Sequence, residues 1–181
     1  GWFGFNGGSA LGANGDAGMA LLATHLSAAA GAATWSAIEW LRHGKPSVLG
    51  IVTGMVAGLG TITPASGFVG PLGALVIGVV AGIICFYMTM AVKQVWKIDD
   101  SLDVFPVHGI GGIIGTLMTS LFASTGIGVF SGQGYLNTAI TSIGQQLWVQ
   151  LVAVFATIVF TAIATWALLK LVNAITPLRV S

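Results

Sequence analysis

The sequence predicts an all-α protein that crosses a membrane several times. Only 6% of its 181 residues are charged and 55% are hydrophobic, whereas about a quarter of the residues in a soluble protein carry charge. The mean hydropathy is correspondingly high, at +0.94. Three long stretches, 17–38, 46–92 and 104–169, contain no Asp, Glu, Lys or Arg. These properties exclude a soluble domain with an ordinary solvated surface.

The charge-free stretches divide into five spans. An α-helix rises about 1.5 Å per residue, so a hydrocarbon core of about 30 Å needs about 20 residues. The first stretch therefore holds one span and the other two hold two each. Residues 63–67 with Gly70 and Pro71 interrupt the second stretch, and the Gly- and Ser-rich segment 124–134 interrupts the third. The expected spans are 17–41, 48–65, 71–93, 102–123 and 143–173.

The basic residues predict the orientation of these spans. If the five spans alternate in direction, every Lys and Arg falls on one side of the membrane, and Lys and Arg collect on the cytoplasmic side. That side, with the C-terminus, is therefore predicted to be cytoplasmic. Trp40 and Trp96 lie at predicted cytoplasmic boundaries, as amphipathic rings prefer. The basic residues are Arg42, Lys45, Lys93, Lys97, Lys170 and Arg179.

Several functional classes lack support in this sequence. A net charge of +1 without a basic cluster provides no positively charged surface to bind nucleic acid. The single cysteine, Cys85, excludes an internal disulfide framework and a Cys-based metal site. The three histidines are far apart and form no metal-binding pair, so we expect no metal. Because no nucleophile–base arrangement or phosphate loop is visible, we expect neither an enzyme nor a cofactor.

His108 is the main candidate for a functional residue inside a span. It lies about six residues, or about 9 Å, into the fourth span, where a titratable side chain is costly unless it faces a polar cavity or a partner. We interpret it as a proton-handling or substrate-contacting group that lines a path. The alternative is a neutral imidazole hydrogen-bonded between helices. Pro106, two residues earlier, is expected to bend the helix near it.

Other polar and small residues in the spans favour structural roles. His25 lies among small residues of the first span, which favours an interhelical hydrogen bond. The Gly-x-x-x-Gly spacing of Gly111 and Gly115 is typical of close helix packing. Gly109, Gly111 and Gly112 also leave room for a solute beside the histidine, and both interpretations stay open.

Acidic residues before the fourth span are predicted to cap it. Asp99, Asp100 and Asp103 suit the positive end of the helix dipole and can accept hydrogen bonds from its unpaired N–H groups. The spacing of Asp100 and Asp103 also approximates a capping box.

Four segments together resemble one family of membrane proteins. They are Gly1–Ser9 (GWFGFNGGS), Gly44–Ser47 (GKPS), Thr63–Ala65 (TPA) and Asp99–Gly109 (DDSLDVFPVHG). This combination resembles the ammonium transporter, methylammonium permease and Rhesus family, and the resemblance extends to the Leu-Arg-Val segment near the end of the chain. It implies a homotrimer of eleven-span subunits, each with its own pore between two inverted five-helix repeats. Residues 1–181 would form a partial transporter domain, from the end of helix six to helix eleven, without the first half and the C-terminal tail.

The resemblance also implies roles for individual residues. Ser9 would contact ammonium in an outer recruitment site, Phe5 would be one of two stacked aromatic gates, and Trp2 would line the pore below them. His108 would be the second member of a histidine pair that crosses the hydrophobic lumen.

Two aspartates receive supporting roles on the same basis. Asp100 would have a symmetry mate in the first half that supports recruitment of the cation, and Asp103 would lie by the cytoplasmic exit.

The implied function is transport of ammonium, ammonia and methylammonium across the inner (plasma) membrane. A permanent charge is costly in a dry lumen, but the aqueous pKa of ammonium, about 9, lets desolvation remove its proton so that neutral ammonia passes. The resemblance leaves two alternatives: an ammonium sensor, with the same fold fused to a signalling domain, and a Rhesus-type channel for ammonia or carbon dioxide. It also implies a PII regulatory protein as a partner of a tail beyond Ser181.

Overall fold

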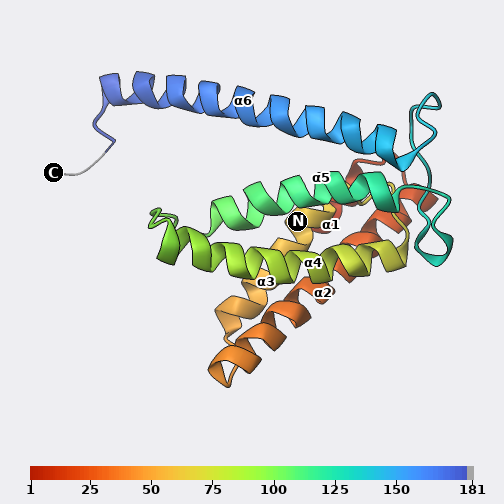
Figure 1. Ribbon diagram of the computed structural model, residues 1–181, viewed down its shortest axis with the longest axis horizontal. Coiled ribbons are helices and arrows are strands. Elements are labelled where there is room, and N and C mark those ends of the chain that lie inside the picture. Colours follow the sequence, from red (N-terminus) through yellow and green to blue (C-terminus); the bar gives the residue numbers. More distant parts are fainter. Residues whose placement is uncertain (179–181) are drawn as a thin grey trace.

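The computed structural model describes residues 1–178, and within that range it contains helices and connecting segments but no strand (Figure 1). This confirms the all-α prediction, because a helix lies in each of the five expected spans. The α-helices are α1 (Trp2–Gly8), α2 (Gly15–His43), α3 (Val48–Ile62), α4 (Pro71–Met90), α5 (Gly111–Phe122) and α6 (Ile143–Ile175). Two π-helical turns, η1 (Ala91–Val95) and η2 (Phe105–Ile110), and a 3₁₀ turn, η3 (Gly128–Phe130), complete the set.

The helix ends follow from local sequence. The side chains of Asn14 and Ser47 accept hydrogen bonds from backbone N–H groups in the first turns of α2 and α3. Ser142 and Gln145 form a reciprocal capping box at the start of α6. Gly44 ends α2 in the left-handed conformation, with φ of 76°, which glycine adopts without steric cost.

Within residues 1–178, three helices are long and apolar enough to cross a membrane: Pro71–Val95, Phe105–Phe122 and Ile143–Ile175. The apolar helix α3 is shorter, with 15 residues. The helix α2 has 29 residues but is less apolar, because it is rich in Ala, Gly, Ser and Thr. All five spans are thus present as helices at the predicted places, and membrane crossing by α2 and α3 stays a prediction.

The connections fall at two ends of the bundle. Figure 1 shows the α2–α3 turn, the α4–α5 turn and the C-terminal end of α6 at one end, and the α3–α4 and α5–α6 connections at the other. This is the arrangement that the alternating spans predict. Arg179 lies outside the described residues. The other basic residues belong to the first of these ends: Arg42, Lys45, Lys93, Lys97 and Lys170.

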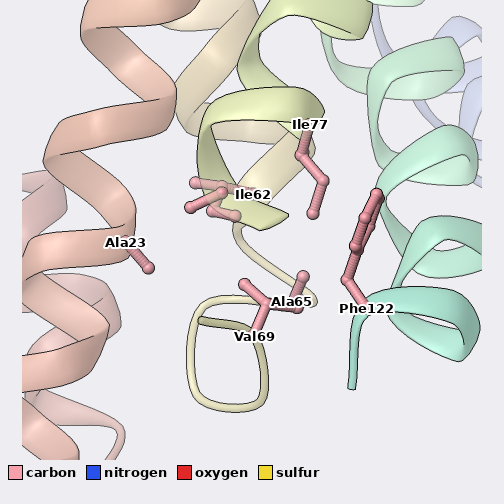
Figure 2. Packing of buried hydrophobic residues seen from close by; sticks show 7 residues of the cluster. Ala23, Ile62, Ala65, Val69, Ile77 and Phe122 are labelled. Carbon is pink, nitrogen blue, oxygen red and sulfur yellow. The ribbon is translucent and has the colours of Figure 1, made fainter. Parts of the chain in front are cut away.

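The core forms where α2, α3 and α4 cross at close range. A Cβ atom on Gly54 would meet the Cβ of Trp35, and one on Gly58 would meet the carbonyl oxygen of Ser27, so α2 and α3 lie almost backbone to backbone. The helix α6 lies beside α5 at the edge of the bundle, and none of its residues is buried (Figure 1). One buried apolar cluster, partly shown in Figure 2, joins α2, α3, α4 and α5 through Ala23, Ile62, Ala65, Val69, Ala74, Ile77 and Phe122.

The Gly-x-x-x-Gly pair packs α5 against α3. A Cβ atom on Gly115 would meet the backbone carbonyl of Thr61, and one on Gly111 would lie 2.8 Å from the Thr61 hydroxyl. Gly112, between them, has no neighbour within 4 Å of such an atom. The packing interpretation is therefore confirmed for the glycine pair.

Candidate functional site

His108 lies in an interruption of regular α-helical geometry. Residues Phe105–Ile110 form the π-helical turn η2, which includes Pro106 and leads directly into α5. A proline removes a backbone donor, and π-helical turns are frequent at functional sites because they redirect a side chain. The interruption predicted near Pro106 is present.

The exposed imidazole of His108 lines a cavity of about 700 Å³ between α3, α5 and α6. Among the described residues that line it, His108 is the one titratable side chain, and the other polar side chains are threonine hydroxyls. The apolar remainder includes Ile113, Val154 and Ile158. Gly109 and Gly112 also lie on this wall. The two interpretations of the glycines therefore apply to different residues: Gly111 packs helices, whereas Gly112 leaves open space. A Cβ atom on Gly109 would lie 3.1 Å from the Phe105 ring.

Three rings form a row that ends at His108. The indole of Trp2 lies parallel to the imidazole, with ring centroids 6.0 Å apart and an interplanar angle of 5°. Phe5 packs edge-on against the other side of the row, on Trp2, with the two ring centroids 6.5 Å apart. The indole N–H of Trp2 donates a hydrogen bond of 2.8 Å to the hydroxyl of Thr63. The structure thus brings together three of the residues singled out from the sequence.

A second cavity, of about 490 Å³, adjoins the first at Thr63 and Pro64, which line both. Phe5 and Ser9 line this outer cavity together with the carboxylate-bearing Asp16. The Ser9 hydroxyl donates to the carbonyl oxygen of Phe5 at 2.9 Å, which leaves its own oxygen free to accept a hydrogen bond. The row of rings therefore runs from a polar outer cavity to an apolar inner one.

The acidic residues before η2 divide into two roles. Asp100 accepts hydrogen bonds from the backbone N–H groups of Val104 and Phe105, at 2.9 and 2.8 Å, which confirms its capping role. Asp103 instead forms an ion pair of 2.7 Å with Lys93. The predicted capping box is wrong, because the Asp103 carboxylate turns toward the end of α4 rather than back to the backbone of Asp100.

The predicted interhelical hydrogen bond of His25 is not found among the described residues. Its side chain is exposed, its ring lies 5.7 Å from that of Phe3, and within residues 1–178 it forms no hydrogen bond. The buried bonds come from its neighbours, because Thr24 and Ser27 are three residues apart and share the inner face of α2. Ser27 donates to the Gly58 carbonyl at 2.9 Å, and Thr24 accepts from an amide on α1 at 3.0 Å.

Sequence reasoning did not identify two residues that hold the row of rings. Asn6 is buried, and its amide donates to Thr24 on α2. Thr63 was interpreted only as part of a helix-breaking segment, yet its hydroxyl holds the indole of Trp2. The one signal for Asn6 was an asparagine within a segment rich in aromatic residues. No signal in the sequence pointed to Thr63.

Comparison with known proteins decides the family. The sequence profile of the Ammonium Transporter Family matches residues 1–181, the whole chain. The chain belongs to the ammonium transporter family. The family resemblance found in the sequence motifs is thereby confirmed.

Individual members of the ammonium transporter family align along nearly all of the chain. It is 46% identical over 181 residues to ammonium transporter Amt1 of Archaeoglobus fulgidus, covering 100% of this chain and 44% of that protein. It is 43% identical over 185 residues to an ammonium transporter of Bacillus subtilis, covering 99% of this chain and 43% of that protein. The chain thus spans less than half the length of these relatives.

Solved structures of the family share the fold. The structure of Saccharomyces cerevisiae Mep2 superposes with a TM-score of 0.82 at 38% identity, covering 99% of this chain and 41% of that one. A structure described as a sensor Amt protein superposes with a TM-score of 0.86 at 28% identity, covering 99% and 42%. The backbone is thus similar to both, and the higher identity is to the transporter, so the sensor alternative has no added support. The match confirms an all-helical, multi-pass membrane protein.

Proposed function

We propose that this chain forms the second half of a subunit that moves ammonium, ammonia and methylammonium across a membrane. Residues 1–181 would extend from the end of the sixth helix to the eleventh. One observation carries the proposal: His108 is the single titratable side chain that the structure describes in the wall of an otherwise apolar cavity, and it lies at the end of a row of aromatic rings.

The cation is recruited at the outer cavity. An ammonium ion above the exposed Phe5 ring and beside the Ser9 hydroxyl gains about 1–2 kcal/mol from the aromatic face. The carboxylate of Asp16, on the same cavity wall, favours positive charge there. Recruitment therefore raises the local concentration of the cation before it meets the apolar lumen.

Deprotonation follows from the loss of water beyond this point. The inner cavity offers mainly apolar and hydroxyl groups, where a permanent charge is costly, so the cation gives up its proton to His108 and its partner histidine and continues as ammonia. Neutral ammonia then accepts or donates a hydrogen bond at the His108 imidazole, which has both a donor and an acceptor nitrogen in its neutral form. With a partner histidine from the first half, His108 would relay the proton and ammonia would be protonated again at the other side.

Two aspartates near the start of η2 have supporting roles. Asp100 caps η2 and so sets where the turn that carries His108 begins. Asp103, paired with Lys93, would lie by the exit. The concentration of Lys and Arg at the end of the bundle with the C-terminus of α6 supports a cytoplasmic C-terminus. Insertion in the plasma membrane is proposed from the family resemblance. A homotrimer and contact of a tail with a PII protein are proposed from the family resemblance.

The test is a pair of histidine variants in the full-length protein, reconstituted in liposomes. We expect His108→Leu to abolish the ammonium-driven current while the protein remains folded and keeps its oligomeric state in detergent. His25→Leu is the matched control, because this exposed histidine lines neither cavity, and its current should equal that of the wild type. An unchanged current in His108→Leu would remove His108 from the pathway and contradict the proposal.

A further inference from the structure

We propose that Thr63 is a positioning residue that holds the Trp2 ring between the outer and inner cavities and thereby sets the rate of passage. This inference rests on the proposed transport function. Thr63 lies at the C-terminal end of α3, and its hydroxyl bonds neither to His108 nor to Phe5.

The hydroxyl of Thr63 joins α1 to α3. Its hydrogen goes to the carbonyl oxygen of Leu59, one turn earlier in α3, at 2.7 Å. Its oxygen is therefore left as an acceptor, and it receives the indole N–H of Trp2 at 2.8 Å and, at 3.5 Å, an amide N–H of Asn6. One hydroxyl thus satisfies donors 61 and 57 residues away along the chain.

Side-chain hydrogen bonds hold α1 against its neighbours. The first joins the Trp2 indole to Thr63 at the end of α3. The second comes from the buried amide of Asn6, which donates to the Thr24 hydroxyl at 3.0 Å. Thr24 in turn donates to the Ala20 carbonyl within α2. Asn6 therefore fixes the backbone of α1, and the bond to Thr63 is left to fix the direction of the Trp2 ring.

The Trp2 ring lies between one residue that lines the outer cavity and one that lines the inner cavity. Thr63 and Pro64 are the two residues that line both cavities, and Trp2 stands between Phe5 of the outer cavity and His108 of the inner one. An indole held only by ring contacts would rotate about its side-chain bonds, because a stacked ring pair constrains the plane less than a directional hydrogen bond does. Rotation would change both the parallel stack on His108 and the opening beside it.

The test is Thr63→Val in the full-length protein, with ammonium flux measured in liposomes as a function of concentration. Valine keeps the shape and removes the acceptor. We expect the maximal flux to fall about five- to tenfold, the equivalent of one lost hydrogen bond, while the half-saturating concentration stays within about twofold because recruitment at Ser9 is untouched. Thr63→Ser should restore the flux.

Two further variants separate positioning from general damage. Thr53→Val is the matched control, since Thr53 makes the same bond to the carbonyl four residues earlier in α3 but holds no aromatic ring, and it should leave the flux unchanged. Trp2→Phe removes the indole donor, so adding Thr63→Val to it should cause no further loss. An unchanged flux in Thr63→Val, no rescue by serine, or additive losses in the double variant would overturn the inference.

Failure of this inference is distinguishable from failure of the proposed function. A silent Thr63→Val beside an inactive His108→Leu refutes the positioning role alone. A His108→Leu protein with full current refutes the transport pathway itself.

Discussion

Replacing Gly115 by alanine should separate α5 from α3 and destabilise the protein. The added Cβ would meet the backbone carbonyl oxygen of Thr61 and would lie 3.1 Å from the Cγ of Pro64. A carbonyl within a helix cannot rotate away as a side chain can, so the two helices must move apart. The movement would also displace the segment that carries Thr63.

The magnitude follows from two opposing terms. Overpacking of a close contact costs about 1–3 kcal/mol, and for a clash with backbone we take the upper part of that range. The helix propensity of alanine returns up to about 1 kcal/mol relative to glycine. The net loss in unfolding free energy is therefore about 1–2 kcal/mol, and the Tm should fall accordingly.

The assay is thermal unfolding of the purified full-length protein, followed by tryptophan fluorescence in one detergent. Gly112→Ala provides the control on the same helix, because no atom lies within 4 Å of its added Cβ. We expect its Tm to equal or exceed that of the wild type. The reasoning is refuted if Gly115→Ala melts at the wild-type temperature, or if both variants lose the same stability.

Three other substitutions test separate parts of the structure. Lys93→Met breaks the 2.7 Å ion pair with Asp103. Because the lysine side chain is 40% exposed, the loss of unfolding free energy should be only about 0.2–1 kcal/mol, and smaller in high salt. A double-mutant cycle with Asp103→Asn that shows no coupling would contradict this. Ser47→Ala removes the N-cap of α3 and the hydrogen bonds that the Ser47 hydroxyl donates to Glu39, and denaturation should show a loss of about 1 kcal/mol in unfolding free energy that Ser47→Thr largely avoids. Phe5→Ala should change ammonium flux but leave the Tm close to the wild-type value, since the ring is 65% exposed; loss of oligomer assembly would instead assign Phe5 a packing role.

The positions of the helices could be predicted closely from charge and hydropathy. The span expected at 71–93 is α4 with η1, Pro71–Val95, and the span expected at 143–173 is α6, Ile143–Ile175. The breaks were equally clear, because α3 ends at Ile62 before the Thr-Pro-Ala segment and α4 begins at Pro71. The π-helical turns were not predicted, since no local propensity distinguishes them from α-helix.

The candidate site was predicted in its members but not in its geometry. Trp2, Phe5 and His108 were named from motifs, and the structure places their rings in one row. The hydrogen bond expected of His25 is made instead by Thr24 and Ser27, because these residues, and not His25, lie on the inner face of α2. Thr63 was missed, because its importance lies in a contact with a residue 61 positions away.

By itself the sequence determined which segments can enter a bilayer, where they end and which family they belong to. These properties depend on the transfer free energy and backbone preferences of residues close together in the chain, so they can be read without knowing what the residues touch. Only the tertiary structure decided which face of each helix points inward, that glycines bring α2, α3 and α5 within backbone contact, and that one threonine hydroxyl holds the ring beside His108. Those outcomes depend on the rotation and crossing of packed helices. Adjacent residues differ by about 100° around a helix, so Thr24 makes a buried hydrogen bond while the imidazole of His25 is exposed.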